Sequence, residues 1–247
     1  MITDSHCHLA GFGKRLGEIV ADSRKAGVEL MVNCPESFEF DECIKLSREF
    51  REIKTCLGIY PCEVPKISEN KIKELMDEIE KNLGNIVGIG EIGLDFKCAT
   101  NESERNKMKD IFAAQIQFAK ENSLPIVVHS RFAERDALEF AESQKAEKVL
   151  MHWYTHSEKL RKKAVDLGYY ISAAPRAVVD EEQKKVIEKI PLENLLIETD
   201  SPVPFNGENA TPSLARFVTE KIAEIKGGSF EDIAGQTSKN AKKLFKI

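Results

Sequence analysis

The chain has 247 residues, 42% of them hydrophobic and 31% charged, a balance that is typical of a folded globular protein and argues against disorder. Its formal charge of -5 argues against a protein that coats nucleic acid by neutralising many phosphates. The longest apolar runs are about five residues, far short of the roughly twenty that cross a bilayer, and the first residues lack a signal-peptide pattern. We therefore expect a cytoplasmic protein with no membrane contact and no obligate protein partner.

Short apolar runs alternate with amphipathic segments along the whole chain, as in repeated βα units. We expect strands at residues 2–5, 30–33, 53–57, 86–89, 126–128, 149–151, 169–172 and 195–198. Helical spacing between them is clearest in two apolar stripes, one at Ile72, Leu75, Met76, Ile79 and Leu83 and one at Leu214, Phe217, Val218 and Ile225.

Eight strands, each followed by a helix, favour a closed TIM-type (β/α)8 barrel, because an open doubly wound sheet more often has five or six strands. An additional helix is expected over residues 229–245, beneath or beside the barrel wall. The sequence contains no linker-like segment, repeat or low-complexity stretch. Residues 1–247 are therefore predicted to form a single α/β domain with an extra C-terminal helix.

The cysteines are irregularly spaced and form no CxxC pair: Cys7, Cys34, Cys43, Cys56, Cys62 and Cys98. In a chain of cytosolic type this spacing favours free thiols over a disulfide framework. Cytosolic disulfides of hyperthermophiles are an exception, and the surface rich in Lys and Glu is compatible with such a source. Because side chains alternate along a strand, Cys7 is expected to point away from its neighbours His6 and His8 and to pack in the wall.

Histidines and acids cluster at the ends of the expected strands. His6 and His8 lie two positions apart and therefore on one face of the first strand, while His129 and His152 follow the fifth and sixth. Glu91 ends the fourth strand and Asp200 the eighth, and in a barrel all these ends meet on one side. Imidazole and carboxylate ligands suit Zn²⁺ or Mn²⁺, and carboxylates with water also admit Mg²⁺.

The six residues predict a site for two divalent cations, bridged by one carboxylate, that would polarise a phosphoryl or carbonyl oxygen and activate a water. Each residue also fits a structural role: His129 as a core histidine, Asp200 as a turn cap, Glu91 as half of an ion pair. Their convergence favours the metal site.

Four motifs then resemble the TatD family of metal-dependent deoxyribonucleases, in order along nearly the whole chain: Asp4-Ser-His-Cys-His-Leu9, Gly90-Glu-Ile-Gly-Leu-Asp95, Val128-His-Ser-Arg131 and Glu198-Thr-Asp-Ser-Pro202, with Asn240 and Leu244-Phe245 near the end. The resemblance implies a metallo-hydrolase barrel with Glu91 bridging two metals. One metal is expected on His6, His8, Glu91 and Asp200, and the other on Glu91, His129 and His152. Glu91 and Asp200 would be the catalytic residues, and Asp200 would act as the general base.

The chain departs from the family pattern in segments that bear on substrate preference. Tyr60 in Gly58-Ile-Tyr-Pro61 stands where family members often have histidine, and the segment His152-Trp-Tyr-Thr-His156 and the pair Leu9-Ala10 also differ. Tyr60 retains a hydroxyl that can form a hydrogen bond.

Two arginines and three aromatic residues, Tyr60 among them, are candidates for substrate contacts. Arg131 and Arg176 are placed to meet phosphate, although a surface ion pair is the alternative for each. Trp153 and Tyr154 follow a candidate ligand and either stack a terminal base or pack the barrel mouth.

We predict a divalent-metal-dependent deoxyribonuclease, a 3′-to-5′ exonuclease-type phosphodiesterase that acts on frayed or single-stranded DNA ends. The same metals would also serve an amide, ester or lactone hydrolase or an aminoacyl-tRNA deacylase, because a fold does not determine its substrate. A histidinol-phosphatase-like barrel shares the His-x-His pattern but matches the Glu91 and Asp200 segments less well. A barrel that binds metal without catalysis is a further alternative.

Overall fold

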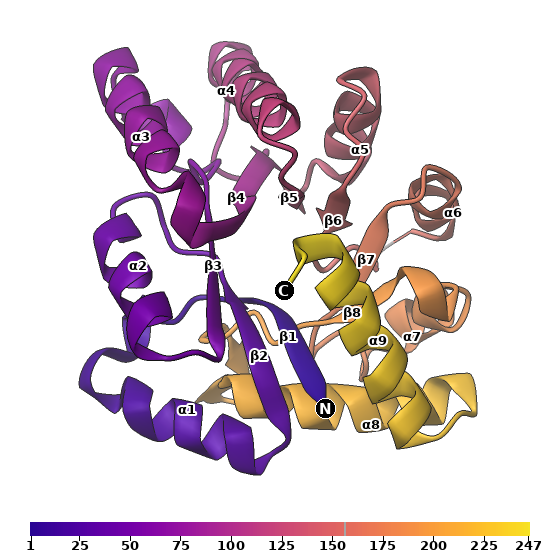
Figure 1. Ribbon diagram of the computed structural model, residues 1–247. Helices are drawn as coiled ribbons and strands as arrows, with labels where there is room; N and C mark the ends of the chain where they lie inside the picture. Colours follow the sequence, from indigo (N-terminus) through magenta and orange to yellow (C-terminus); the bar gives the residue numbers. More distant parts are fainter. Residues whose placement is uncertain (156) are drawn as a thin grey trace.

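The computed structural model describes residues 1–155 and 157–247. Eight parallel strands follow one another around a single sheet in chain order, with helices on the outside (Figure 1). The strands are β1 (Ile2–Cys7), β2 (Val28–Asn33), β3 (Ile53–Leu57), β4 (Ile86–Asp95), β5 (Ile126–Arg131), β6 (Val149–Met151), β7 (Tyr170–Ala173) and β8 (Leu195–Ile197).

The surrounding helices are α1 (Leu16–Lys25), α2 (Phe40–Glu49), α3 (Glu69–Lys81), α4 (Glu102–Glu121), α5 (Glu134–Ser143), α6 (Glu158–Asp166), α7 (Glu181–Glu188) and α8 (Ala215–Lys226). A ninth helix, α9 (Phe230–Phe245), crosses in front of the barrel in Figure 1. The order of elements confirms the predicted (β/α)8 barrel with an additional C-terminal helix. No described helix has the length and apolar character that crossing a membrane requires.

Backbone hydrogen bonds between the ends of β1 and β8 close the seam of the barrel. The amide of Asp200 donates to the carbonyl of His6 at 3.0 Å, and the amide of His8 donates to the carbonyl of Ser201 at 2.7 Å. Residues from opposite ends of the sequence are therefore fixed side by side at the carboxyl-terminal end of the strands.

Strand β4 extends further than the sequence pattern indicates. It was expected to span residues 86–89 with Glu91 at its end, but it continues through Glu91 to Asp95. Gly93 explains the difference: its φ of +139° is open to glycine, and a Cβ atom there would lie 2.1 Å from the carbonyl oxygen of His129. Glycine here allows β4 to run close to β5. In the sequence alone, a glycine at this position instead indicates the turn that ends a strand.

The core consists of two apolar clusters. The larger lies between the strands and the outer helices, and it includes Leu75 and Ile79 of α3 and Val218 and Ile222 of α8, in agreement with the predicted helical stripes. The smaller joins strand residues to the end of α9 and consists of Val32, Cys34, Cys56, Val127, Leu150, Leu196, Ala241, Leu244 and Phe245. The last helix thus fills the amino-terminal end of the barrel.

Asn240 attaches α9 to the strand that closes the barrel. Its buried amide group donates to the carbonyls of Leu192 at 2.8 Å and Leu195 at 2.9 Å, at the start of β8. Ser229 caps the other end of the helix by accepting from the amide of Asp232. The helix that ends the barrel is thus fixed by polar contacts as well as by apolar packing.

Two cysteines are paired. Cys62, in the loop after β3, and Cys98, in the loop after β4, form a disulfide with Cα atoms 5.2 Å apart. The expectation of free thiols is therefore wrong for this pair, and it is confirmed for Cys7, Cys34, Cys43 and Cys56, which are free and buried. The pairing follows from the adjacency of β3 and β4 in the sheet, which irregular spacing in the sequence does not reveal.

Candidate metal centre

The structure brings together all six residues that the sequence singled out. They lie at the end of β1 (His6 and His8), within β4 and β5 (Glu91 and His129), directly after β6 (His152) and in the segment after β8 (Asp200). On one side of the group, Oδ1 of Asp200 lies 3.4 Å from Nε2 of His6 and 3.3 Å from Nε2 of His8. The other nearby acid is Glu91, whose Oε2 lies 3.7 Å and 3.8 Å from the same two nitrogens. These atoms are close enough to share one cation with small adjustments of the side chains.

The second carboxylate oxygen of Glu91 faces the opposite side. Its Oε1 lies 2.5 Å from Nδ1 of His129 and 3.0 Å from Nε2 of His152. One buried carboxylate thus divides the four histidines into two pairs, with one oxygen directed at each pair. This is the arrangement required of a carboxylate that bridges two ions.

Buried acids behind the histidines were not among the predicted site residues. Nε2 of His129 lies 3.0 Å from Oδ2 of Asp95, and Nδ1 of His152 lies 3.3 Å from Oε1 of Glu198. Ser172 donates to the other oxygen of Glu198 at 2.5 Å. Such acids fix the orientation and tautomer of a histidine that binds metal. Both lie within motifs of the sequence, but spacing alone does not indicate which acid meets which ring.

Asp4 joins the two strands that close the barrel. Its carboxylate accepts from the amide of Thr199 at 3.0 Å and from the hydroxyl of Thr199 at 2.5 Å. Burial raises the pKa of Asp4 to about 8, although these hydrogen bonds oppose the shift. Asp4 therefore supports the backbone that carries His6 and Asp200 and does not itself face the group.

The ionisable groups of the centre stabilise one another's charged forms. Burial raises the pKa of Glu91, but the charges of His129, His152 and His6 outweigh it and hold that pKa well below its usual value. Burial also raises the pKa of Asp200, but the contacts of Asp200 with His6 and His8 outweigh burial. The pKa of Asp200 therefore lies below its usual range. Burial lowers the pKa of His8, yet Asp200 and Glu91 raise it to about 9. Both carboxylates thus remain ionised, as cation ligands must be.

His6 provides an independent test of whether the donors fit a metal. The residue is fully buried, and neither of its ring nitrogens has a hydrogen-bond partner among the described residues. A buried imidazole without partners is costly unless another group occupies its lone pair. His6 belongs to two sets of donor atoms, and within each set all the atoms lie within 4.8 Å of one another. The first set consists of His6, His8 and Asp200, and the second of His6, Glu91 and His152. The nitrogen and oxygen donors therefore fit divalent cations of the Zn²⁺ or Mn²⁺ type.

The group lies at the base of a pocket of about 990 Å³. Four of the five candidate substrate residues line this pocket: Tyr60, Arg131, Trp153 and Arg176. The two arginines are exposed, whereas Tyr60 and Trp153 are half-buried. The rim also carries Phe132, of which 69% is exposed to solvent. The pocket therefore offers both cationic and aromatic surface beside the buried donors.

The two aromatic residues after His152 differ in role. Trp153 lines the pocket, with its indole nitrogen 3.4 Å from Oε1 of Gln183. Tyr154 is buried, and its hydroxyl donates to the carbonyl of Glu134 at 2.6 Å, so it packs the wall and is not available for stacking. His156, in the segment that departs from the family pattern, lies outside the described residues.

Tyr60 and Cys7 can be placed with respect to the centre. The ring of Tyr60 meets that of His129 edge to face, with centroids 5.3 Å apart. Burial and the charge of Glu91 raise the pKa of Tyr60, so its hydroxyl stays protonated. Cys7 is buried and its thiol points to the carbonyl of Val32, 3.5 Å away, which agrees with the expectation that it packs in the wall.

Comparisons with known proteins agree with this geometry. A family model described as TatD related DNase matches residues 3–246. Human deoxyribonuclease TATDN3 is 32% identical over 258 residues, covering 99% of this chain and 94% of that protein. An uncharacterized metal-dependent hydrolase of Bacillus subtilis, YabD, is 33% identical over 261 residues and all of both chains. The crystal structure of YJJV, a TatD homologue from Escherichia coli, has the same fold, with a TM-score of 0.89 over 100% of this chain and 98% of that chain at 24% identity.

Proposed function

Because this chain belongs to the TatD family of metal-dependent DNases and hydrolases, we propose that it is a deoxyribonuclease that hydrolyses phosphodiester bonds at DNA ends in the 3′-to-5′ direction. The observation that carries the proposal is the position of Glu91. Its two oxygens face two separate pairs of histidines, so the centre has donors for two cations that share one carboxylate. His6, His8, Glu91 and Asp200 would hold one cation, and Glu91, His129 and His152 the other.

The bound cations would supply charge neutralisation at the phosphoryl oxygens and a water that loses its proton near neutral pH. Asp200 accepts that proton, because its carboxylate is ionised and lies at the boundary between the buried donors and the open pocket. Glu91 holds the two pairs of histidines in fixed positions relative to each other. Mixed nitrogen and oxygen donors favour Mn²⁺ or Zn²⁺ over Mg²⁺, which prefers a shell of oxygens.

The pocket suits the end of a strand better than the middle of a duplex. Its volume of about 990 Å³ is that of a site for a small ligand and accommodates one or two nucleotides. Arg131 and Arg176 would bind the adjacent phosphates, and Trp153 would stack on a base. These phosphate contacts need only the two arginine side chains at the pocket, so they are compatible with a chain of net negative charge.

The test uses protein stripped of metal with a chelator and reloaded separately with Mg²⁺, Mn²⁺ or Zn²⁺. Single-stranded DNA labelled at its 5′ end should shorten one nucleotide at a time, and chelation should abolish the reaction. Asp200→Asn, assayed at a cation concentration that saturates its weakened site, should lower kcat by about 10²–10⁴-fold, the usual contribution of a general base.

Asp180→Asn is the matched control for this experiment. Asp180 also lines the pocket, but its carboxylate caps α7, a role that asparagine fulfils equally well. The control should therefore keep full activity. A metal-loaded protein that leaves DNA ends intact but hydrolyses a carboxyl ester would overturn the DNase proposal in favour of an ester hydrolase with the same centre.

A further inference from the structure

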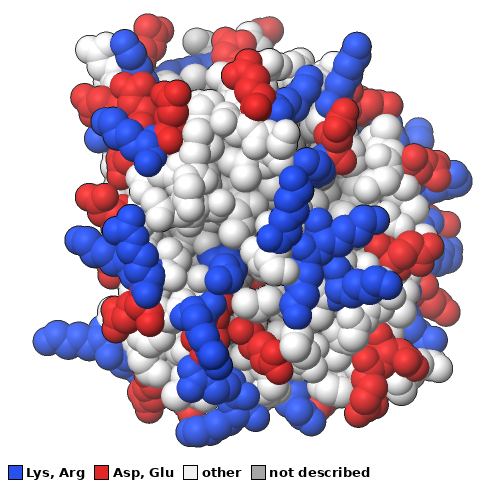
Figure 2. Space-filling view, viewed as in Figure 1, with Lys and Arg blue, Asp and Glu red and all other residues white. Residues whose placement is uncertain are grey.

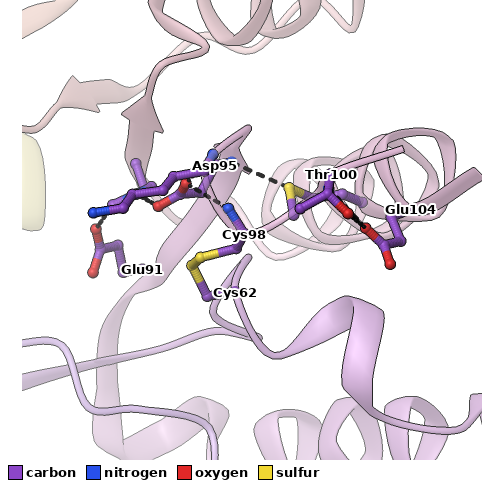
Figure 3. The surroundings of a disulfide bond; sticks show 9 residues. Cys62, Glu91, Asp95, Cys98, Thr100 and Glu104 are labelled. Atoms are coloured by element: carbon purple, nitrogen blue, oxygen red, sulfur yellow. Dashed lines mark hydrogen bonds and ion pairs between the residues drawn. A yellow bond between two sulfur atoms is a disulfide. The ribbon is translucent and has the colours of Figure 1, made fainter. Parts of the chain in front are cut away.

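A disulfide lies beside the metal centre, on the same side of the barrel. Cys62 and Cys98 are 36 positions apart in the sequence, and their bond connects the loop after β3 to the loop after β4. Figure 3 shows the bond next to Asp95, with Glu91 on the far side of that carboxylate. Both cysteines are only half-buried, whereas the four free cysteines are buried. Among the cysteines in the described part of the chain, the two of the disulfide are therefore the most accessible to solvent and reductants.

Asp95 links this disulfide to the centre. Its Oδ1 accepts from the amide of Cys98 at 3.2 Å and from the amide of Lys97 at 2.8 Å. Its Oδ2 lies 3.0 Å from Nε2 of His129, and the other ring nitrogen of His129 faces Glu91. A series of contacts thus runs from the backbone amide of Cys98 through the carboxylate of Asp95 and the ring of His129 to Glu91 (Figure 3).

The cluster of Cys62, Asp95 and Cys98 also has donor atoms spaced for a cation. Both oxygens of Asp95, however, already accept hydrogen bonds from two amides and a histidine, and the two sulfur atoms are bonded to each other. The hydrogen bonds of Asp95 therefore direct its carboxylate toward His129 and leave few oxygen lone pairs for an additional ion. What the disulfide can change is the position of the loop whose amides hold Asp95.

We propose that the Cys62–Cys98 disulfide is a redox-sensitive restraint that positions Asp95 and, through it, the ring of His129. A dithiol reductant would transfer two electrons and two protons, break the sulfur–sulfur bond and leave two thiols, while the reductant becomes a disulfide. The loops after β3 and β4 are then no longer joined, and Asp95 holds His129 less firmly. Metal affinity should fall by about 10-fold or more, as when the outer partner of a ligand is lost.

The proposal rests on the proposed metal role of His129, so its experiment includes a measurement that needs no metal. Metal-free protein is prepared oxidised, or reduced with a phosphine that is then removed without air. Alkylation and mass spectrometry report which cysteines are modified, and the nitrogen resonances of the His129 ring report how firmly hydrogen bonds hold its two nitrogens. Mn²⁺ affinity is measured by titration, because Mn²⁺ prefers oxygen and nitrogen donors over thiolate.

In the oxidised protein, Cys62 and Cys98 should resist alkylation, the nitrogens of the His129 ring should give one sharp set of resonances, and Mn²⁺ should bind tightly. Reduction should expose both thiols, shift or broaden those resonances and weaken Mn²⁺ binding. Cys62→Ser and Cys98→Ser should each bind Mn²⁺ weakly with or without reductant, whereas Cys43→Ser, which alters a free buried cysteine, should keep the response.

Equal Mn²⁺ affinity and unchanged His129 resonances after complete reduction would overturn the restraint. Alkylation of Cys62 and Cys98 before any reductant is added would do the same. Failure of even the oxidised protein to bind Mn²⁺ would instead count against the metal centre, and the His129 resonances would still decide the restraint on their own.

Discussion

The histidines of β5 and β6 present opposite ring nitrogens to Glu91. His129 turns Nδ1 toward Glu91 and Nε2 toward Asp95, whereas His152 turns Nε2 toward Glu91 and Nδ1 toward Glu198. In the neutral form that binds metal, the nitrogen that faces the outer acid would carry the proton, so the two residues would hold opposite tautomers and direct their lone pairs toward the side of Glu91. We propose that the two outer acids thereby determine where a cation binds.

Glu198→Gln should test this role of an outer acid. The amide that replaces the carboxylate is a weaker acceptor for the Nδ1 proton of His152, so we expect metal affinity to fall by about 10–100-fold with the fold intact. Metal titration and circular dichroism measure the two quantities. Ser172→Ala, which removes the hydroxyl donor to Glu198 and the acceptor of the Trp153 amide, should have the smaller effect. An equal loss in both variants would contradict the assignment.

Arg131→Ala should separate phosphate recognition from general surface charge. Arg131 is exposed and lines the pocket, and a charged hydrogen bond to phosphate contributes about 1.5–3 kcal/mol, so kcat/KM on DNA should fall by about 10–100-fold. Arg135→Ala removes an equally exposed arginine on α5 that does not line the pocket, and kcat/KM should not change. The comparison is made by steady-state kinetics, and equal losses in both variants would exclude the phosphate contact.

Strand β4 is the element on which the centre depends most, because it carries both Glu91 and Asp95. Its path beside β5 requires Gly93, where an added Cβ atom would meet the backbone of His129. The sequence predicts the eight strands and singles out six residues that the structure places close together, because each of them follows an apolar run. It does not predict the length of β4, the role of Asp95 or the Cys62–Cys98 bond, since these depend on which strands become neighbours.

Gly93→Ala should destabilise the protein and disturb the centre together. The strained φ and the overlap with the carbonyl of His129 should each cost about 1–3 kcal/mol of unfolding free energy. Urea unfolding measures the loss, and metal titration should show weaker binding because His129 moves. Gly84→Ala, at an exposed position where an added Cβ atom meets nothing within 4 Å, is the control and should leave both unchanged. A stable Gly93→Ala variant would show that β4 can shift freely.

Charge is distributed unevenly between the two ends of the barrel. The first turns of α1 to α7, at the end that carries the pocket, contain Glu18, Asp41, Glu42, Glu69, Glu102, Glu104, Glu134, Asp136, Glu158, Glu181 and Glu182. The opposite end shows lysine and arginine across the middle of the face where α9 lies (Figure 2), with Lys239 and Lys243 exposed on that helix and Lys246 exposed directly after it. This placement complements the helix dipoles and surrounds the pocket with acids that repel a long nucleic acid.

Hydrolysis of single-stranded DNA should accordingly depend only weakly on salt. Two arginines that meet phosphates predict a slope of about -1.4 for the logarithm of the association constant against the logarithm of salt concentration. Binding of a short oligonucleotide at several salt concentrations measures the slope, and Arg131→Ala should reduce it by about 0.7. A slope of about -5 or steeper would instead indicate an extended basic groove.

The closed seam between β1 and β8 has a consequence for biosynthesis. Asp4 and Thr199, which bind each other there, are 195 positions apart, so a ribosome adding about 5–20 residues per second needs roughly 10–40 s between them. During that interval the emerging polypeptide holds His6 and His8 but lacks Asp200. If Asp200 has the role proposed above, cation binding and hydrolysis would begin only after the eighth strand has been translated and docked.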